Sequence, residues 1–245
     1  MTNEQILVIA LAFTIAGVAK GAIGIGMPPI AIGIMTFRVP LADALALLTF
    51  PTLLTNVAQA FTGGHFRPLL RRFRSMAVLA VVGVLGAGFF LGKLGSPGMI
   101  SWLGVVLTIY AAIALFAWRP VMPIAHESWG NPLIGLMSGI VAGVTGMAAV
   151  PFLPYMQSLQ MTRNDLVQGL GIMFLVIMLA LAAALVQQNI FTSANVLGSV
   201  LALAPTFVGV TIGNRIRHAA SPETFRKIFL VGMLALGLNM ASGLL

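Results

Sequence analysis

The chain has 245 residues, of which 59% are hydrophobic and only 7% are charged, and its formal net charge is +8. A soluble domain carries about 25% charged residues, so this composition leaves too few to cover a surface in water. It excludes an ordinary soluble domain, and the excess of Lys and Arg then indicates cytoplasmic loops rather than a nucleic-acid site. The absence of cysteine excludes disulfides, thiolate metal sites and cysteine nucleophiles.

Four stretches without a charged residue are each longer than the roughly 20 residues that cross a bilayer as a helix. They are 44–66, 94–118, 128–162 and 166–214. Because their apolar residues are continuous rather than alternating, they predict an all-α polytopic membrane protein and not a β-barrel. About eight hydrophobic segments follow one another, near 4–36, 41–62, 75–94, 98–118, 131–158, 164–187, 195–213 and 225–244.

The first segment, 4–36, contains the stretch GVAKGAIGIGMPPIAIG and is too long for a single crossing. As one straight helix it would run about 50 Å, against a hydrocarbon core of about 30 Å. Its glycines and its two prolines, Pro28 and Pro29, predict that the helix is broken. Segment 131–158 combines similar length with the same residue types, so it is predicted to be broken as well.

A break at membrane depth exposes the N–H groups of a half-helix N-terminus, where the helix dipole favours an anion. Glycines allow a ligand to approach the backbone, and Lys20 adds an ionisable group that is costly unless it faces a cavity or a partner. The predicted substrate contacts in this half are Lys20, Gly21, Gly24, Ile25 and Gly26. Two alternatives stay open: the glycines pack against other helices, and Lys20 snorkels to the interface.

Polar residues in the other apolar segments supply the remaining candidates. Amide groups donate hydrogen bonds to anion oxygens, which makes Asn56 and Gln168 candidate cavity-lining residues. Thr145 and Gly146 lie in the second broken segment and are predicted substrate contacts for that reason. The alternative for the polar side chains is that they link helices or bond to their own helix.

The two halves of the sequence match. A shift of 122 residues, followed by one of 125 after a three-residue slip, pairs Gly17 with Gly139, Gly21 with Gly143, Gly24 with Gly146, Pro29 with Pro151, Asp43 with Asp165, Phe66 with Phe191, Gly88 with Gly213 and Ser96 with Ser221. We therefore predict two repeats, 1–121 and 122–245, in a single membrane domain. The paired aspartates stand at helix starts, where a carboxylate complements the helix dipole, and we prefer this structural role to one in coupling.

Loop charges bear on the orientation of the repeats. If all eight segments cross the membrane, five basic residues face one side and seven the other, which is no bias. If both long segments re-enter on the side they left, ten face one side and only Arg38 and Lys93 the other, as the positive-inside rule requires. The predicted fold therefore has inverted repeats, each opening with a broken or re-entrant helix, and both termini outside. Four of the ten form a predicted basic loop: Arg67, Arg71, Arg72 and Arg74.

An intramembrane enzyme is disfavoured, because the sequence has no HExxH motif, no rhomboid-type Gly-x-Ser-Gly motif and no carboxylate pair within its apolar runs. A helical scaffold would need neither a buried lysine nor broken helices. The stretch GVAKGAIGIGMPPIAIG followed by VPLADALALLTF resembles the sulfite exporter TauE/SafE family, also called the toluene sulfonate uptake permease family. So does SGIVAGVTGMAAVPFLPYMQ followed by MTRNDLVQG, although GMAAVP carries alanines where the family has glycines.

The resemblance covers nearly the whole chain and implies transport of sulfur-containing anions, such as sulfite, sulfoacetate and other organosulfonates, across the bacterial inner membrane. The expected protein is a secondary transporter that works by alternating access, with its substrate between the two broken segments. The alternative is channel-like or facilitated permeation without coupling. We expect no cofactor, no metal and no nucleic acid. The expected partners are the anion and the bilayer, and a homodimer stays open.

Overall fold

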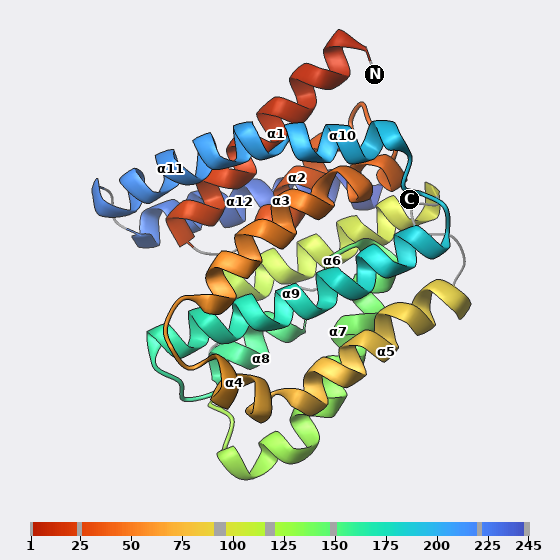
Figure 1. Cartoon of the computed structure of the whole chain (residues 1–245). Coiled ribbons are helices and arrows are strands. Elements are labelled where there is room, and N and C mark those ends of the chain that lie inside the picture. The colour runs from red at the N-terminus through yellow and green to blue at the C-terminus, as the bar shows by residue number, and fades with distance from the viewer. Residues whose placement is uncertain are drawn as a thin grey trace. The chain divides into compact units, whose positions relative to one another are not determined.

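The structure is a computed structural model that describes residues 2–23, 26–90, 97–115, 121–147, 151–219 and 222–242. Throughout these ranges the regular structure is helical, apart from one isolated bridge between Met122 and Leu159 (Figure 1), so the predicted all-α class is confirmed. The helices of the first half are α1 (Asn3–Ile23), α2 (Met27–Met35), α3 (Leu41–Phe61), α4 (Phe66–Arg72), α5 (Arg74–Phe90) and α6 (Pro97–Leu115). Those of the second half are η1 (Ile124–His126), α7 (Glu127–Thr145), α8 (Phe152–Ser158), α9 (Arg163–Gln187), α10 (Ser193–Leu201), α11 (Leu203–Ala219) and α12 (Pro222–Ala241).

Several of these helices are long and apolar enough to cross a membrane. Four candidates meet the test alone: α1, α3, α9 and the α10–α11 stretch. A fifth is the α4–α5 pair, whose helices are bent by 66° relative to each other. Shorter apolar helices lie at 99–115 in α6 and 230–241 in α12. This set of helices indicates a multi-pass membrane protein.

The order of the helices is the same in both halves of the chain. A long helix is followed by a short one, a second long one, a second short one and then two long ones, in α1–α6 and again in α7–α12. The offsets follow the register of the sequence: α3 begins at 41 and α9 at 163, which is 122 later, while α6 begins at 97 and α12 at 222, which is 125 later.

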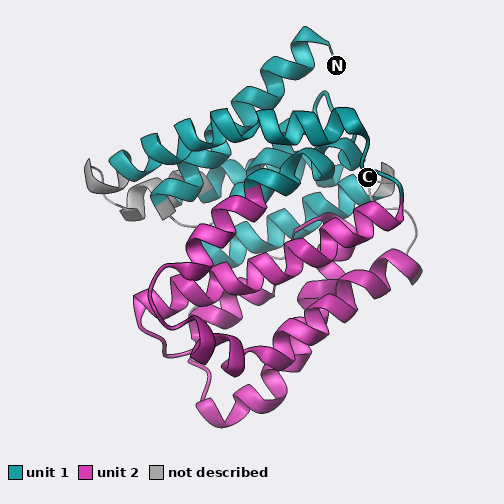
Figure 2. Cartoon of the chain, viewed as in Figure 1, with its two compact units in different colours: residues 1–51, 95–117, 189–245 teal, residues 52–94, 118–188 magenta. Residues whose placement is uncertain are grey.

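The chain forms two compact units, and each takes helices from both sequence halves (Figure 2). Unit 1 contains 1–51, 95–117 and 189–245, and unit 2 contains 52–94 and 118–188. The division falls inside α3, directly after Pro51, so this single helix supplies its first half to unit 1 and its second half to unit 2.

In unit 1, α1 and α11 run parallel with their backbones in close approach. A Cβ atom added at Gly17 would meet the backbone at Thr206 and Gly209, and one added at Gly21 would meet Val210 and Asn214. This approach is possible because both helices present glycines, as in the small-xxx-small contacts of membrane helices. Gly17 and Gly21 therefore have the packing role that the sequence left open as an alternative.

In unit 2, α5 and α7 repeat this arrangement. Cβ atoms added at Gly135, Gly139 and Gly143 would meet α5 at Met76, Ala80 and Val84, in rising order along both helices, so the pair is again parallel. In the repeat register α7 is the equivalent of α1 and α5 that of α11. Each unit is thus built around one parallel glycine contact between a helix of the first half and a helix of the second.

A second pair in unit 1, α6 and α12, runs antiparallel. A Cβ atom at Gly104 would lie between Gly237 and Ala241, whereas one at Gly237 would lie between Gly104 and Thr108. The partner number therefore falls as the residue number rises, and the two helices run in opposite directions in Figure 1. These helices are equivalents of each other in the repeat.

Pro51 interrupts the hydrogen bonding of α3, because a proline has no N–H to offer the carbonyl four residues earlier. Ser199 of α10 fills this gap within unit 1. Its hydroxyl donates to the Leu47 carbonyl at 2.7 Å and accepts from the Phe50 N–H at 3.1 Å, and the Ser199 side chain is buried. The Ser199 hydroxyl thus replaces the N–H partner that the Leu47 carbonyl lacks because of the proline.

Candidate functional site

The first predicted break separates two helices in unit 1. α1 ends at Ile23, and Gly26 precedes α2 with a φ of 97°, in the left-handed region where glycine is favoured. Met27 is the first residue of α2, with Pro28 and Pro29 directly after it. The predicted contacts Gly24 and Ile25 lie outside the described residues.

The prolines change the expected supply of donors at this break. Of the first three residues of α2, only Met27 carries an N–H group, because Pro28 and Pro29 have none. The N–H of Ile30 bonds to the Gly26 carbonyl at 3.4 Å. The start of α2 therefore offers fewer N–H groups than a half-helix N-terminus usually does. An anion bound here would depend on few backbone donors and on a side-chain cation.

Lys20 supplies a cation close to this point. It lies in the last turn of α1, one helical turn before the break, and its side chain is half-buried. A lysine in that position is close in sequence to both Gly21 and Gly26. Of these two, Gly21 is in backbone contact with α11, whereas Gly26 forms the turn into α2.

The second predicted break lies in unit 2, where the end of α7 is described. α7 ends at Thr145, and Gly146, with a φ of 74°, closes the helix through an N–H bond of 2.7 Å to the Ala142 carbonyl. The Thr145 hydroxyl donates to the Val141 carbonyl at 2.7 Å and accepts from the Met147 N–H at 3.2 Å. Thr145 and Gly146 thus lie at the C-terminal end of α7. This end exposes carbonyl groups rather than N–H groups, and the helix dipole there is negative.

The ends of each broken segment meet each other. In unit 1, Gln5 near the start of α1 donates from Nε2 to the carbonyl of Arg38, three residues beyond α2, at 3.1 Å. In unit 2, the N–H of Met122, before α7, donates to the carbonyl of Ser158, the last residue of α8, at 3.0 Å. Both segments therefore return to the end of the unit from which they started.

The two predicted amide residues are both buried in unit 2. Gln168 joins the start of α9 to the end of α3, since its Nε2 donates to the Ala60 carbonyl at 2.8 Å and its Oε1 accepts from the His65 N–H at 3.0 Å. Asn56 lies one helical turn before Ala60 on α3. An anion bound at Gln168 would have to compete with these backbone bonds.

The paired aspartates both make hydrogen bonds at helix starts. Asp43 accepts from Asn195 Nδ2 at 2.9 Å. Asp165 accepts from the Thr162 hydroxyl at 2.8 Å and lies 2.6 Å from Nδ1 of His65. The bonds of Asp43 to Asn195 and of Asp165 to His65 link the starts of two long helices to other parts of the chain within their units, which agrees with the structural role preferred from the sequence.

The predicted basic loop is wrong, because its residues are helical. Arg67, Arg71 and Arg72 lie on α4, and Arg74 begins α5. The sequence predicts a loop here because these arginines stand between two apolar segments, and positive charge at that position is typical of a loop that sets membrane topology. Only Arg72 turns inward, where it forms a two-pronged ion pair with Glu127, Nε to Oε2 at 2.8 Å and Nη2 to Oε1 at 2.5 Å.

Sequence reasoning missed this ion pair and the buried network around it. Asn131 of α7 donates from Nδ2 to the Arg72 carbonyl at 3.2 Å and accepts at Oδ1 from the Tyr155 hydroxyl of α8 at 2.7 Å. Glu127 was the one signal available, as an acidic residue directly before a long uncharged stretch. In the described part of the chain, no group of three or more His, Asp or Glu side chains is placed to hold a metal ion.

Apolar helices long enough to span a membrane, together with the glycine-packed helix pairs, indicate a multi-pass membrane protein. The profile of the sulfite exporter TauE/SafE family matches residues 9–240, which is nearly the whole chain. The protein belongs to this family, whose members are transporters. No curated protein and no solved structure matches the chain.

Proposed function

We propose that this protein is a secondary transporter that moves a small sulfur-containing anion, such as sulfite or an organosulfonate, across the bacterial inner membrane by alternating access. The observation that carries the proposal is the family match over 9–240. The family description names sulfite, and Lys20 beside the first break provides the positive charge that such an anion requires.

Substrate contacts in unit 1 are assigned to the Lys20 side chain and to the backbone at Gly21, Gly24, Ile25 and Gly26. The ammonium group supplies the charge, and the left-handed turn at Gly26 leaves the backbone open to close approach. Asn56, Thr145, Gly146 and Gln168 of unit 2 stay proposed contacts. A sulfonate is charged at any physiological pH, so these donors need not match a protonation state of the substrate.

Inverted repeats with two re-entrant segments are part of the proposal. The meeting of Gln5 with Arg38, and of Met122 with Ser158, supports re-entry, because a segment that crossed the membrane would have its ends on opposite sides. The antiparallel packing of α6 and α12 supports inversion: repeat equivalents with the same orientation in the membrane would run parallel.

Counterflow in proteoliposomes tests the transport mode. Vesicles loaded with unlabelled sulfite and placed in dilute labelled sulfite are expected to accumulate label transiently, because a carrier exchanges substrate across the membrane. Equilibration of label without an overshoot, and without stimulation by sulfite inside, would instead favour the second candidate, channel-like permeation.

Lys20→Ala tests the proposed site. Because a hydrogen bond to a charged group contributes about 1.5–3 kcal/mol, we expect sulfite or sulfonate affinity to fall roughly tenfold or more, measured by calorimetry on the purified protein. Lys20→Arg keeps the charge and is expected to retain most of the affinity. Lys227→Ala on α12 removes an exposed charge and serves as the matched control. Unchanged affinity in Lys20→Ala would remove this lysine from the site.

A further inference from the structure

The short helix α4 presents arginines to the outside of unit 2. Arg67 and Arg71 are four residues apart, and therefore lie on one face of the helix, and Arg74 follows as the first residue of α5. All three side chains are exposed, whereas Leu69 and Phe73 between them are buried. We call Arg67, Arg71 and Arg74 the α4 arginine cluster.

Inward contacts fix the position of this helix. α4 is bent by 66° from α5. At the bend, Arg72 holds Glu127 with two hydrogen bonds of 2.8 and 2.5 Å, and its carbonyl accepts from Asn131. A bidentate guanidinium–carboxylate pair has strong directional preference. Arg72 thus anchors α4 to α7 and leaves the other three arginines facing outward.

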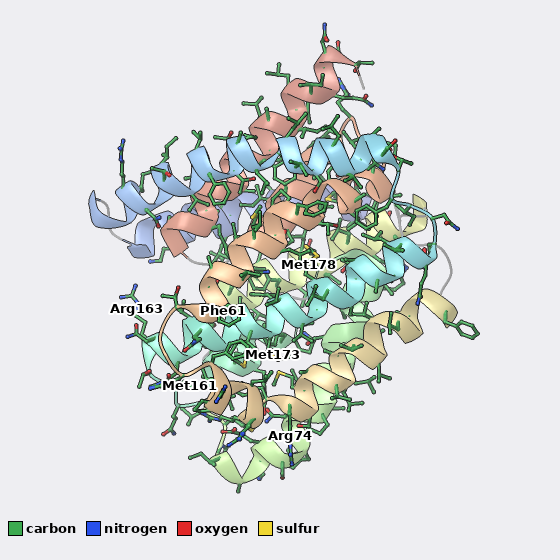
Figure 3. The ribbon with its side chains drawn as sticks, in the orientation of Figure 1. Phe61, Arg74, Met161, Arg163, Met173 and Met178 are labelled. Carbon is green, nitrogen blue, oxygen red and sulfur yellow. The ribbon has the colours of Figure 1, made fainter. Side chains whose placement is uncertain are left out.

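Neighbouring charges do not neutralise the cluster. Glu127 is paired with Arg72, and Asp165 of α9, which accepts from Thr162 and lies beside His65, sets one negative charge against the three arginines. The nearby start of α9 adds a further exposed cation, Arg163; Figure 3 shows the Arg74 and Arg163 side chains at the starts of their helices. The end of unit 2 that carries α4 is therefore strongly positive.

An aromatic pair lies next to the cluster. Phe61, the last residue of α3, stacks on Phe66, the first residue of α4, with ring centroids 4.7 Å apart. The Phe61 side chain is 63% exposed. Segments that lie in the membrane interface combine aromatic side chains with basic residues. This short helix, bent away from a membrane span, has both.

We propose that the α4 arginine cluster binds the phosphate headgroups of anionic phospholipids, with α4 lying in the interface and the Phe61–Phe66 pair directed to the acyl-chain boundary. Guanidinium groups match phosphate oxygens in a two-pronged geometry. A basic residue near an anionic membrane surface contributes a factor of about five in association, so three residues together give on the order of 100-fold. This inference does not depend on which anion the protein transports.

Trp129 provides a probe at the same end of unit 2. It lies two residues after Glu127, the partner of Arg72, and is 53% exposed. The chain has three tryptophans, so Trp102→Phe with Trp118→Phe leaves Trp129 as the single emitter. Bromine on a lipid quenches indole fluorescence only at short range, so quenching reports which lipids occupy this surface.

The experiment compares brominated phosphatidylglycerol with brominated phosphatidylcholine in nanodiscs of otherwise identical composition. We expect phosphatidylglycerol to quench Trp129 with an association constant about 10- to 100-fold higher, and the difference to shrink with added salt. Arg67→Gln/Arg71→Gln/Arg74→Gln is expected to bring the ratio close to one. The triple Lys variant keeps the charge and is expected to retain most of the preference, and Arg38→Gln on unit 1 is expected to retain all of it.

Three outcomes would overturn the proposal. The first is equal quenching by the two lipids with the cluster unsubstituted, which requires only the Trp102→Phe/Trp118→Phe background to fold. The second is an undiminished preference in the triple Gln variant. The third is loss of the preference on adding millimolar glycerol phosphate or sulfite, which would mean that the cluster collects small soluble anions and not lipid.

Discussion

At Gly26 the backbone adopts a conformation that other residues avoid. Its φ of 97° places it in the left-handed region, and it directly precedes the first turn of α2. An L side chain in this region costs about 1–2 kcal/mol. The glycine thus allows α1 and α2 to be separate helices with a sharp change of direction between them.

Gly26→Ala is expected to lower the free energy of unfolding by about 1 kcal/mol or more, because alanine is strained at this φ. The check is the thermal unfolding midpoint of the purified protein in one fixed detergent. Gly86→Ala is the matched control: Gly86 lies within α5, and a Cβ atom there meets nothing within 4 Å. Alanine at that helical position is expected to be neutral or stabilising. Equal effects of the two changes would contradict the strain argument.

The residues that carry the break were predictable from the sequence, whereas the hydrogen-bond partners of the polar candidates were not. Runs of Gly and Pro punctuate helices whatever the tertiary context, so Gly26 and the prolines after it indicated a break from local chemistry alone. The same prolines remove N–H groups from α2, which limits the anion site that the break was expected to form. Gln168 was read as cavity-lining, yet its amide bonds run to Ala60 and His65, which are more than 100 positions away in the chain.

At the scale of one element, α3 combines two opposing features: it is a continuous helix of 21 residues, and it contains Pro51. A proline inside a helix costs about 3 kcal/mol or more, in part because the carbonyl four residues earlier loses its N–H partner. Ser199 donates to the Leu47 carbonyl and accepts from Phe50, so a residue of the second repeat stabilises the interrupted turn of the first. This contact joins positions about 150 residues apart, and no local pattern predicts it.

Ser199→Ala is expected to destabilise the protein by about 2 kcal/mol, because it leaves two buried backbone groups of α3 without this partner. Pro51→Ala restores an N–H that can bond to Leu47, so we expect Ser199→Ala to cost about 1 kcal/mol less in that background. A double-mutant cycle on unfolding midpoints measures the coupling.

Thr206→Val is the control for losing a buried hydroxyl, since this hydroxyl donates to the Ala202 carbonyl within its own helical stretch. We expect it to cost less than Ser199→Ala. If the two substitutions at Ser199 and Pro51 proved additive, Ser199 would not be acting through the turn that the proline interrupts.

Across the whole molecule, the structural units do not coincide with the sequence repeats. Unit 1 takes α1, α2, the first half of α3 and α6 from the first half of the sequence and α10 to α12 from the second. Unit 2 takes the second half of α3, α4 and α5 from the first half and α7 to α9 from the second. The predicted repeat rests on glycines at matching positions in the two halves of the sequence, and the shared helix order supports it. The sequence does not show that helices from both halves combine in each unit, because this depends on which glycine surfaces meet in three dimensions.

The contacts between helix ends support the membrane topology proposed above. In the arrangement with eight crossings, the loop before α4 and the start of α9 would lie on opposite sides of the membrane. His65 and Asp165, which belong to these two places, are 2.6 Å apart in unit 2. The arrangement with two re-entrant segments puts both places on the same side, together with most of the basic residues.

Single cysteines in this cysteine-free chain test the arrangement directly. With two re-entrant segments, Arg71→Cys and Arg163→Cys should resist a membrane-impermeant maleimide in intact cells and react once the membrane is permeabilised. Thr2→Cys, Arg38→Cys and Ser242→Cys should react in intact cells. With eight crossings, Arg71→Cys and Arg163→Cys would differ from each other, and Arg38→Cys would be on the side opposite to Thr2→Cys. The pair Thr2→Cys and Arg38→Cys is decisive, because it brackets one broken segment and changes no residue of the proposed substrate site.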